Sequence, residues 1–216
     1  MILIAIDGAC RRNGQPDCTS AGGVFIQRED TLMPTVLSCF EYNSTNQRGE
    51  LLALLKALDF IHTADDDCIV VTDSEYIFNA MTKQWYINWQ NKGWVTAAND
   101  PVKNKDIWME IAHAMSRIES EVLFYHIKGH CIPFGKVTAE NSLRADPSGQ
   151  LLLSQVRQKF DDLAPTKQKV FRDAQELSKK NNGYDLPYSV FKQFIIANTV
   201  VDAVATKVVE AADRER

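Results

Sequence analysis

The sequence predicts an α/β protein in which a mixed five-stranded sheet carries helices on both faces and a helical C-terminal extension follows. Three observations predict this class. Three β-type segments come first and are joined by short connections. They are followed by a helix, a buried strand, more helix and a last strand, an order that places helices on the faces of a sheet. After residue 150 the apolar spacing is helical throughout.

Each element rests on a local pattern. The first strand is a β-branched apolar run, and the next two segments alternate as antiparallel strands do. The first helix carries leucine and isoleucine on a single stripe, at 51, 54, 55, 58 and 61. In chain order we expect strands at 2–7, 21–27 and 35–42, a helix at 46–62, a strand at 68–72 with a helix after it, a helix at 102–118 and a strand at 121–127.

The chain divides into two predicted parts. Residues 1–155 hold the whole sheet, and residues 156–216 form a helical C-terminal extension. Pro165 and the segment NNGYDLP at 181–187 break this extension into separate helices. A chain of 216 residues with 45% apolar residues is long enough for one sizeable core and such an accessory segment.

Several protein classes are disfavoured by the composition. No apolar stretch is long enough to span a bilayer, so we expect no membrane partner. No basic leader precedes the first strand, and we expect the protein in the cytoplasm or the nucleus. The five cysteines show no CxxC pair and no zinc spacing, so free thiols are expected.

Charge is distributed unevenly along the chain. Residues 1–150 hold 13 Lys and Arg against 19 Asp and Glu, a net −6, whereas residues 151–216 hold 11 against 9, a net +2. An overall charge of −4 gives no general signal for a nucleic-acid partner. The acidic part therefore either binds a cation or avoids polyanions.

Two predicted strands end at an aspartate. Asp7 follows ILIAI, and Asp73 follows IVVT. Taken alone, Asp7 is more typical of a turn residue and Asp73 of a helix N-cap. Glu50 differs, because it sits at the margin of the leucine stripe, where a carboxylate needs a partner. If the two strand ends lie side by side, the three carboxylates converge, and a hard divalent cation such as Mg²⁺ or Mn²⁺ relieves their repulsion.

The residues that carry these carboxylates form longer motifs. IDGACRRNGQ, STNQRGELLALLKAL, VVTDSEY, WYINWQNKGW, PVKNKDIW and YHIKGH follow one another in the order and spacing of the type 1 ribonuclease H domain. Over roughly residues 1–155 the chain resembles a cellular, eukaryotic-like member of that family. The resemblance implies a ribonuclease H-like fold and cleavage of the RNA strand of an RNA–DNA hybrid with two Mg²⁺ ions, for which Mn²⁺ can substitute. Two metals about 3.5–4 Å apart serve the nucleophile and the leaving oxygen in such hydrolysis.

The resemblance also implies catalytic roles. Asp7 bridges both ions, and Glu50 and Asp73 hold the metal nearest the leaving group. A fourth carboxylate, after the last strand, holds the metal that activates water. In the segment VTAENSLRADPSG the local Ala-Asp motif favours Asp146 for this role. The number of residues after the KGH histidine favours Asn141 instead. Asp146-Pro147 also has the signature of a helix start.

His130 of KGH matches the family's mobile-loop histidine, which assists proton movement and product release. An ordinary surface histidine is the alternative.

Substrate contacts are implied by the same resemblance. Asn46 and Gln47, with the loop backbone from Cys10 to Asn13, match readers of the RNA strand, whose 2′-hydroxyl distinguishes it from DNA. One of Trp85, Trp89 and Trp94 packs against a DNA sugar, although tryptophans at helical spacing are more often core. Thr45 and Asn104 match two members of a DNA phosphate pocket, but its usual arginine is absent near Asn43 and Ser44. Positive charge for phosphates comes from Lys83, Lys92, Lys103 and Lys105.

Two questions stay open at the level of sequence. The apolar stripe from Val190 to Val208 either packs on its own domain or contacts a partner, with a monomer preferred over a dimer. The alternative to an active, hybrid-cleaving enzyme is an inactive domain of the same fold that binds nucleic acid or protein.

Overall fold

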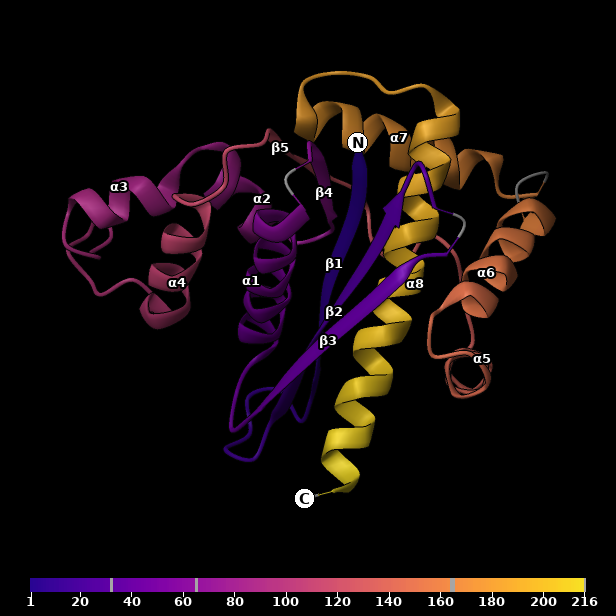
Figure 1. Cartoon of the computed structure of the whole chain (residues 1–216), viewed down its shortest axis with the longest axis horizontal. Helices are drawn as coiled ribbons and strands as arrows, with labels where there is room; N and C mark the ends of the chain where they lie inside the picture. Colours follow the sequence, from indigo (N-terminus) through magenta and orange to yellow (C-terminus); the bar gives the residue numbers. More distant parts are fainter. Residues whose placement is uncertain (32, 65, 164–165, 216) are drawn as a thin grey trace.

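A computed structural model describes residues 1–31, 33–64, 66–163 and 166–215 of the chain. Five strands form one mixed sheet in the order β3-β2-β1-β4-β5 (Figure 1). Their bounds are β1 Ile2–Arg11, β2 Thr19–Arg28, β3 Thr35–Tyr42, β4 Cys68–Thr72 and β5 Val122–His126. β1 pairs antiparallel with β2 and parallel with β4, which confirms the predicted mixed sheet.

The first strand is longer than predicted. It continues past Asp7 to Arg11, because the β1–β2 hairpin stays paired as far as Arg11 and Thr19. The parallel pairing of β1 with β4 stops earlier, at Ala5 and Val71. Asp7 therefore lies inside β1 but beyond the end of its neighbour β4, so groups from both faces of the sheet can reach it there.

Four helices lie on one side of the sheet, with α3 and α4 beyond α1 and α2 (Figure 1). They are α1 Asn46–Ala64, α2 Glu75–Thr82, α3 Trp85–Asn91 and α4 Lys105–Met115. The predicted leucine stripe of α1 is largely buried there: Leu51, Leu54 and Leu58 are closed off from solvent among apolar residues of β1, β2 and β4. The indole of Trp108 in α4 is also fully buried and donates a hydrogen bond to Tyr76 Oη at 2.7 Å.

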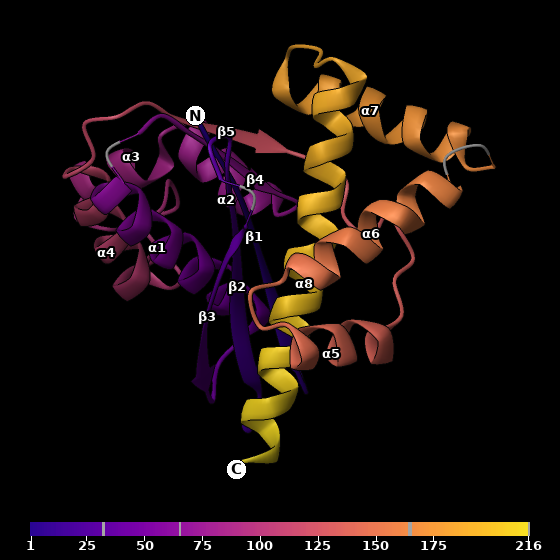
Figure 2. The same cartoon turned by 45° about the vertical axis from the view of Figure 1, so that its right-hand side comes forward.

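The other face belongs to the C-terminal half of the chain. It carries α5 Lys136–Ala145, α6 Gln150–Leu163, α7 Gln168–Asn182 and α8 Tyr188–Arg214. Figures 1 and 2 show that α8 lies along the sheet. They also show that α5, α6 and α7 lie farther from the strands than α8 does. Phe194, Val200 and Val201 of α8 are buried in one core with residues of β1, β2 and β5. The apolar stripe of the extension therefore packs on its own sheet; Pro165, one of its predicted helix breakers, lies outside the described residues.

α8 approaches the sheet closely because β2 has glycine at the contact. A β-carbon on Gly23 would lie 2.9 Å from Val201 O and 3.1 Å from Ala205 N. Both are backbone atoms of α8, so a side chain at Gly23 would force the helix away from the sheet.

Polar contacts tie the extension to the sheet at two places, the end of α7 and the end of α8. At the β5 edge, the side-chain amide of Asn182 bonds to the backbone of His126 as a neighbouring strand would. Its Oδ1 accepts from His126 N and its Nδ2 donates to His126 O, each at 2.8 Å. This covers part of an edge strand that would otherwise present open backbone groups. At the other end, the buried carboxylate of Asp213 accepts a hydrogen bond from Arg12 at 2.5 Å and lies 3.5 Å from Arg11 Nε.

The expectation of free thiols is wrong for one pair. Cys10 and Cys18 form a disulfide across the β1–β2 hairpin, since antiparallel pairing brings the two strand ends together. Cys39, Cys68 and Cys131 are free. Among the described residues, no helix has the length and apolar character needed to cross a membrane.

We expect Gly23→Ala to lower the stability of the protein. The added methyl group meets backbone atoms of α8 that cannot rotate away, and overpacking of this kind costs about 1–3 kcal/mol. Gly135→Ala is the control, because a β-carbon there finds its nearest neighbour at 3.5 Å. Thermal unfolding checks this: Tm should fall by several degrees for the first variant and change little for the second. Equal Tm values would contradict the close approach of α8.

Candidate active site

Asp7 is the buried centre of the candidate site, with only 7% of its surface exposed. It stands opposite Gly23 in the antiparallel pair, and directly paired residues point to the same face of the sheet. Since Gly23 faces α8, the Asp7 side chain also points toward α8. Its Oδ1 accepts a hydrogen bond from Gly8 N at 2.7 Å. Asp7 is thus not the turn residue that the sequence alone allowed.

Glu50 reaches the same place from the opposite face of the sheet. A β-carbon on Gly8 would lie 2.5 Å from Glu50 N, so the first turns of α1 lie directly against β1. The Glu50 carboxylate accepts hydrogen bonds from Ser74 Oγ at 2.5 Å and from Asn46 Nδ2 at 2.9 Å. These two contacts fix its orientation.

Asp73 follows the last residue of β4 and does not cap the helix after it. Ser74 is the N-cap residue of α2, with its side chain accepting from Ile77 N at 3.5 Å. Asp73 is therefore not the N-cap residue of α2. The backbone at Gly129 lies against the Asp73 carboxylate, so closely that a β-carbon there would overlap Oδ2.

A fourth carboxylate joins them from α8, and sequence reasoning missed it. Asp202 follows Val201, the residue packed on Gly23. Its Oδ2 lies 3.5 Å from Nδ1 of His130, and its charge acts on both Asp7 and Asp73. No local motif marks Asp202, because it stands within a long amphipathic helix far from the other carboxylates in sequence.

The structure does not bring Asp146 or Asn141 to this cluster. Asp146 bonds to the residues that follow it: its Oδ2 accepts from Leu151 N at 2.8 Å and its Oδ1 from Ser148 Oγ at 2.6 Å. These hydrogen bonds hold the pKa of Asp146 below its usual range. The predicted helix start at Asp146 is wrong, because Asp146 ends α5 and α6 begins at Gln150. The hydrogen bonds of Asp146 to Ser148 and Leu151 occupy its carboxylate. Asn141 is exposed on α5, a helix that the sequence did not predict. The role of Asp146 as a metal ligand stays a prediction that this arrangement does not favour.

Burial and mutual repulsion dominate the electrostatics of the cluster. Burial raises the pKa of Asp7 well above its usual value, and Asp73 and Asp202 raise it further. Burial also raises the pKa values of Glu50 and Asp73, although the Ser74 hydrogen bond opposes this at Glu50 and His130 opposes it at Asp73. Such a site gains free energy when a cation neutralises it.

The donor set fits a hard divalent cation. All four side chains offer carboxylate oxygens, which suit Mg²⁺ or Mn²⁺ better than zinc. Within the described part of the chain, no three of the acidic, histidine or cysteine side chains stand close enough to form a ready-made metal centre. The four carboxylates act on one another through their charges without forming such a centre.

His130 lies at the mouth of this region. Its side chain is 78% exposed and its backbone is left-handed, with φ of 54°. It borders a cavity of about 550 Å³ between the KGH loop and α8, together with Gly8, Cys10 and Asp202. The predicted loop histidine is therefore adjacent to two of the carboxylates while open to solvent.

The predicted readers of the RNA strand gather at the start of α1. Asn46 N donates a weak hydrogen bond to Asn13 Oδ1 at 3.4 Å, which joins the exposed β1–β2 loop to α1. Asn46 also holds Glu50 through its side chain. The Oε1 atom of Gln47 is buried with no hydrogen-bond partner among the described residues.

The two predicted phosphate-pocket residues lie on either side of Arg48. This arginine joins the first turn of α1 to that of α4, with Nε 2.7 Å from Glu41 Oε2 and Nη2 2.8 Å from Asp106 Oδ2. Thr45 precedes α1, and Asn104, whose Nδ2 is buried without a partner among the described residues, precedes α4. Arg48 is neutralised by two carboxylates and so does not replace the missing arginine.

The tryptophans belong mainly to the protein interior. Trp85 and Trp89 are half-buried, with ring centroids 6.1 Å apart, and Trp89 packs edge-on against Trp108 at 5.4 Å. Lys83, Lys92, Lys103 and Lys105 are exposed.

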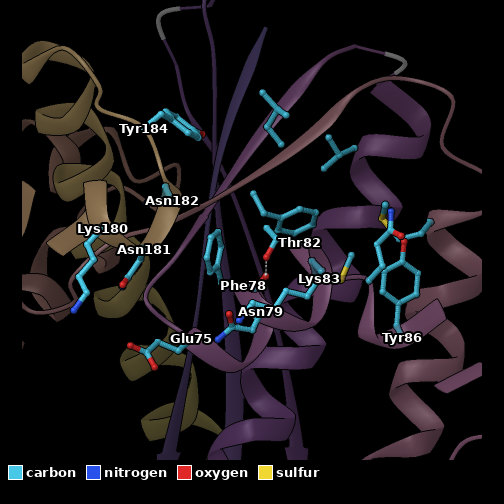
Figure 3. Close-up of a pocket in the computed structure, with 16 residues that line it drawn as sticks. Glu75, Phe78, Asn79, Thr82, Lys83, Tyr86, Lys180, Asn181, Asn182 and Tyr184 are labelled. Carbon is cyan, nitrogen blue, oxygen red and sulfur yellow. Dashed lines mark hydrogen bonds between the residues drawn. The ribbon is translucent and has the colours of Figure 1, made fainter. Parts of the chain in front are cut away.

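A separate cavity of about 760 Å³ lies between α2, β5 and the end of α7 (Figure 3). Lys83 and Lys180 enter it from opposite sides, with Phe78 and Asn181 between them. None of the four clustered carboxylates lines it, so it is distinct from the candidate active site.

Comparison with known proteins identifies the family. The RNase H family model matches residues 1–146, more than half of the chain. The chain belongs to the ribonuclease H family. The matched segment contains Asp7, Glu50, Asp73 and His130, and it ends before Asp202.

Relatives and solved structures agree with this family. The chain is 35% identical to the ribonuclease H of Alcanivorax borkumensis over 129 residues, which are 60% of this chain and 80% of that protein. It is 40% identical to the ribonuclease H of Oleidesulfovibrio alaskensis, over 59% and 77% of the two chains. The solution structure of the PFV RNase H domain shares the fold, with a TM-score of 0.50 and 22% identity over 68% of this chain and 90% of that one.

We expect Mg²⁺ to stabilise this ribonuclease H more at pH 8 than at pH 5. The folded protein holds protons on Asp7, Glu50 and Asp73 more tightly than the unfolded chain does. Without metal, its stability therefore falls as the pH rises from the ordinary carboxyl range through these raised values, where the ionised groups also face Asp202 and His130. Bound cation removes this loss. Scanning calorimetry with Mg²⁺ and with EDTA measures the Tm difference, and a difference independent of pH would contradict the assignment.

Proposed function

We propose that this ribonuclease H hydrolyses the RNA strand of RNA–DNA hybrids and needs divalent metal ions, two Mg²⁺ per site, to do so. The observation that carries the proposal is the convergence of Asp7, Glu50 and Asp73 beyond the end of β4, inside the family-matched residues. Bound divalent cations would neutralise the phosphate, activate water and stabilise the leaving oxygen. Mn²⁺ has the same ligand preference and is expected to substitute.

The protein's own residues hold this site in position. Asp7 is fixed in β1 by pairing with β2 and points toward the other carboxylates. Ser74 and Asn46 orient Glu50. His130, exposed on its loop and 3.5 Å from Asp202, can take up or release a proton near the scissile bond and return it to solvent.

Substrate selection rests on the surface around α1. Gln47 and Asn13 flank Asn46 at the edge of the carboxylate cluster, where an RNA strand would present its 2′-hydroxyls. Thr45 and Asn104, at the starts of α1 and α4, are the proposed contacts to a phosphate of the DNA strand. Positive charge is limited to exposed lysines such as Lys92, so binding should be weak and sensitive to salt.

An inactive, nucleic-acid-binding domain of the same fold is the second candidate. It is disfavoured because Asp7 is buried, and keeping a buried anion without a cation destabilises the fold. A binding module has no need of such a group.

The proposal is tested with labelled duplexes. The protein should cut the RNA strand of a hybrid in Mg²⁺, should cut a DNA duplex carrying several consecutive ribonucleotides, and should leave an all-DNA duplex intact. EDTA should abolish cutting. Equal cutting of hybrid and DNA duplexes would refute selection by the 2′-hydroxyl.

Asp73→Asn should abolish cleavage while the fold is kept or slightly stabilised. The substitution removes one charge from a repulsive, buried cluster, so the metal-free Tm should not fall. Glu119→Gln is a matched control, a carboxylate on the loop before β5. Gel assays and thermal unfolding measure both effects, and near wild-type cutting by the Asp73 variant would remove this residue from the site.

A further inference from the structure

The carboxylate cluster is completed by a helix outside the family-matched segment. We propose that Asp202 of α8 is the fourth carboxylate ligand of the divalent-cation site, so that the C-terminal extension supplies part of the active site. This inference rests on the proposed function, since it names a further ligand of the same site.

The packing of α8 sets Asp202 at the level of Asp7. Val201 O would lie 2.9 Å from a β-carbon on Gly23, and Gly23 is the residue paired with Asp7. Asp202 is the next residue along the helix. The side chains of Asp7 and Asp202 therefore start from adjacent positions on the two sides of one helix–sheet contact.

Contacts near the two ends of α8 independently indicate the same position of Asp202 along β1. Asp213 of α8 contacts Arg11 at the end of β1, and Phe194 borders the same surface recess as Leu3 near its start. α8 and β1 thus run in the same direction. Asp202 precedes Asp213 by about 16 Å of helix, and Asp7 precedes Arg11 by about 13 Å of strand.

The contacts of Asp202 direct it to the site. Its Oδ2 is 3.5 Å from His130, whose neighbour Gly129 lies against Asp73. It lines the same cavity as Gly8, the residue after Asp7. The side chain is 38% exposed, which leaves room for water beside it.

The burial of Asp7 distinguishes this cluster from an ordinary group of acidic side chains on a protein surface. Asp7 is more than nine-tenths buried and faces α8. Its carboxylate accepts a hydrogen bond from the backbone of Gly8, and among the residues that the structure describes no lysine or arginine makes an ion pair with it. Placing Asp202 opposite such a group adds repulsion, which a cation between them reverses.

Two other interpretations make different predictions. In the first, Asp202 serves only as the ion-pair partner of His130, and metal binding does not depend on it. Alternatively, Asp146 holds the metal, which requires it to leave its hydrogen bonds to Leu151 and Ser148.

Titration calorimetry of Mn²⁺ and Mg²⁺ into the full chain, without nucleic acid, separates these cases. Asp202→Asn should weaken divalent-cation binding by roughly tenfold, since affinity follows the number of charged ligands, and should not lower the metal-free Tm. Asp202→Glu should recover part of the affinity. Glu210→Gln, about two turns farther along α8, is the matched control and should bind like the wild type.

The outcomes are distinguishable from failure of the proposed function. Unchanged binding by Asp202→Asn, with weakened binding by Asp73→Asn, would overturn the assignment of Asp202 while keeping the metal site. Weakened binding by Asp146→Asn alone would return the role to Asp146. No effect of Asp73→Asn on binding would remove the proposed metal site itself.

Discussion

The structure depends on a concentration of negative charge at one point of the sheet. Asp7 is buried inside a strand, and carboxylates reach it from α1, from the end of β4 and from α8. Each of these elements must approach β1 closely, and glycines at the contacts allow it. The same repulsion that destabilises the metal-free protein is what gives the site its affinity for a cation. Stability and activity are therefore linked through one charge cluster.

The termination of β4 makes this arrangement possible. β1 continues beyond it with β2 as its only neighbour, so the sheet has an open flank just where Asp7 lies. Groups that belong to opposite faces of the sheet, Glu50 on one and Asp202 on the other, can meet there without passing through a strand. This geometry follows from the different lengths of β1 and β4, together with the close approach of α1 at Gly8 and of α8 at Gly23.

The C-terminal extension is part of the structural unit in this chain. α8 buries its apolar face against β1 and β2, and Asn182 pairs with the backbone of β5. The segment that the family match omits thus contributes one face of the core. If Asp202 binds metal, the extension is also required for catalysis, and its docking would be coupled to metal binding.

The sequence by itself determined the five strands, the first helix and three of the clustered carboxylates. It could do so because strand alternation, the leucine stripe and motifs such as VVTDSEY depend on residues close together in the chain. It placed a helix start and a metal ligand at Asp146, because an aspartate that bonds to nearby backbone and one that faces the site look alike in sequence. Which carboxylate is brought beside Asp7 depends on the tertiary structure. The packing of α8 on Gly23 makes it Asp202, almost 200 residues away in sequence, and no local pattern encodes a contact over that distance.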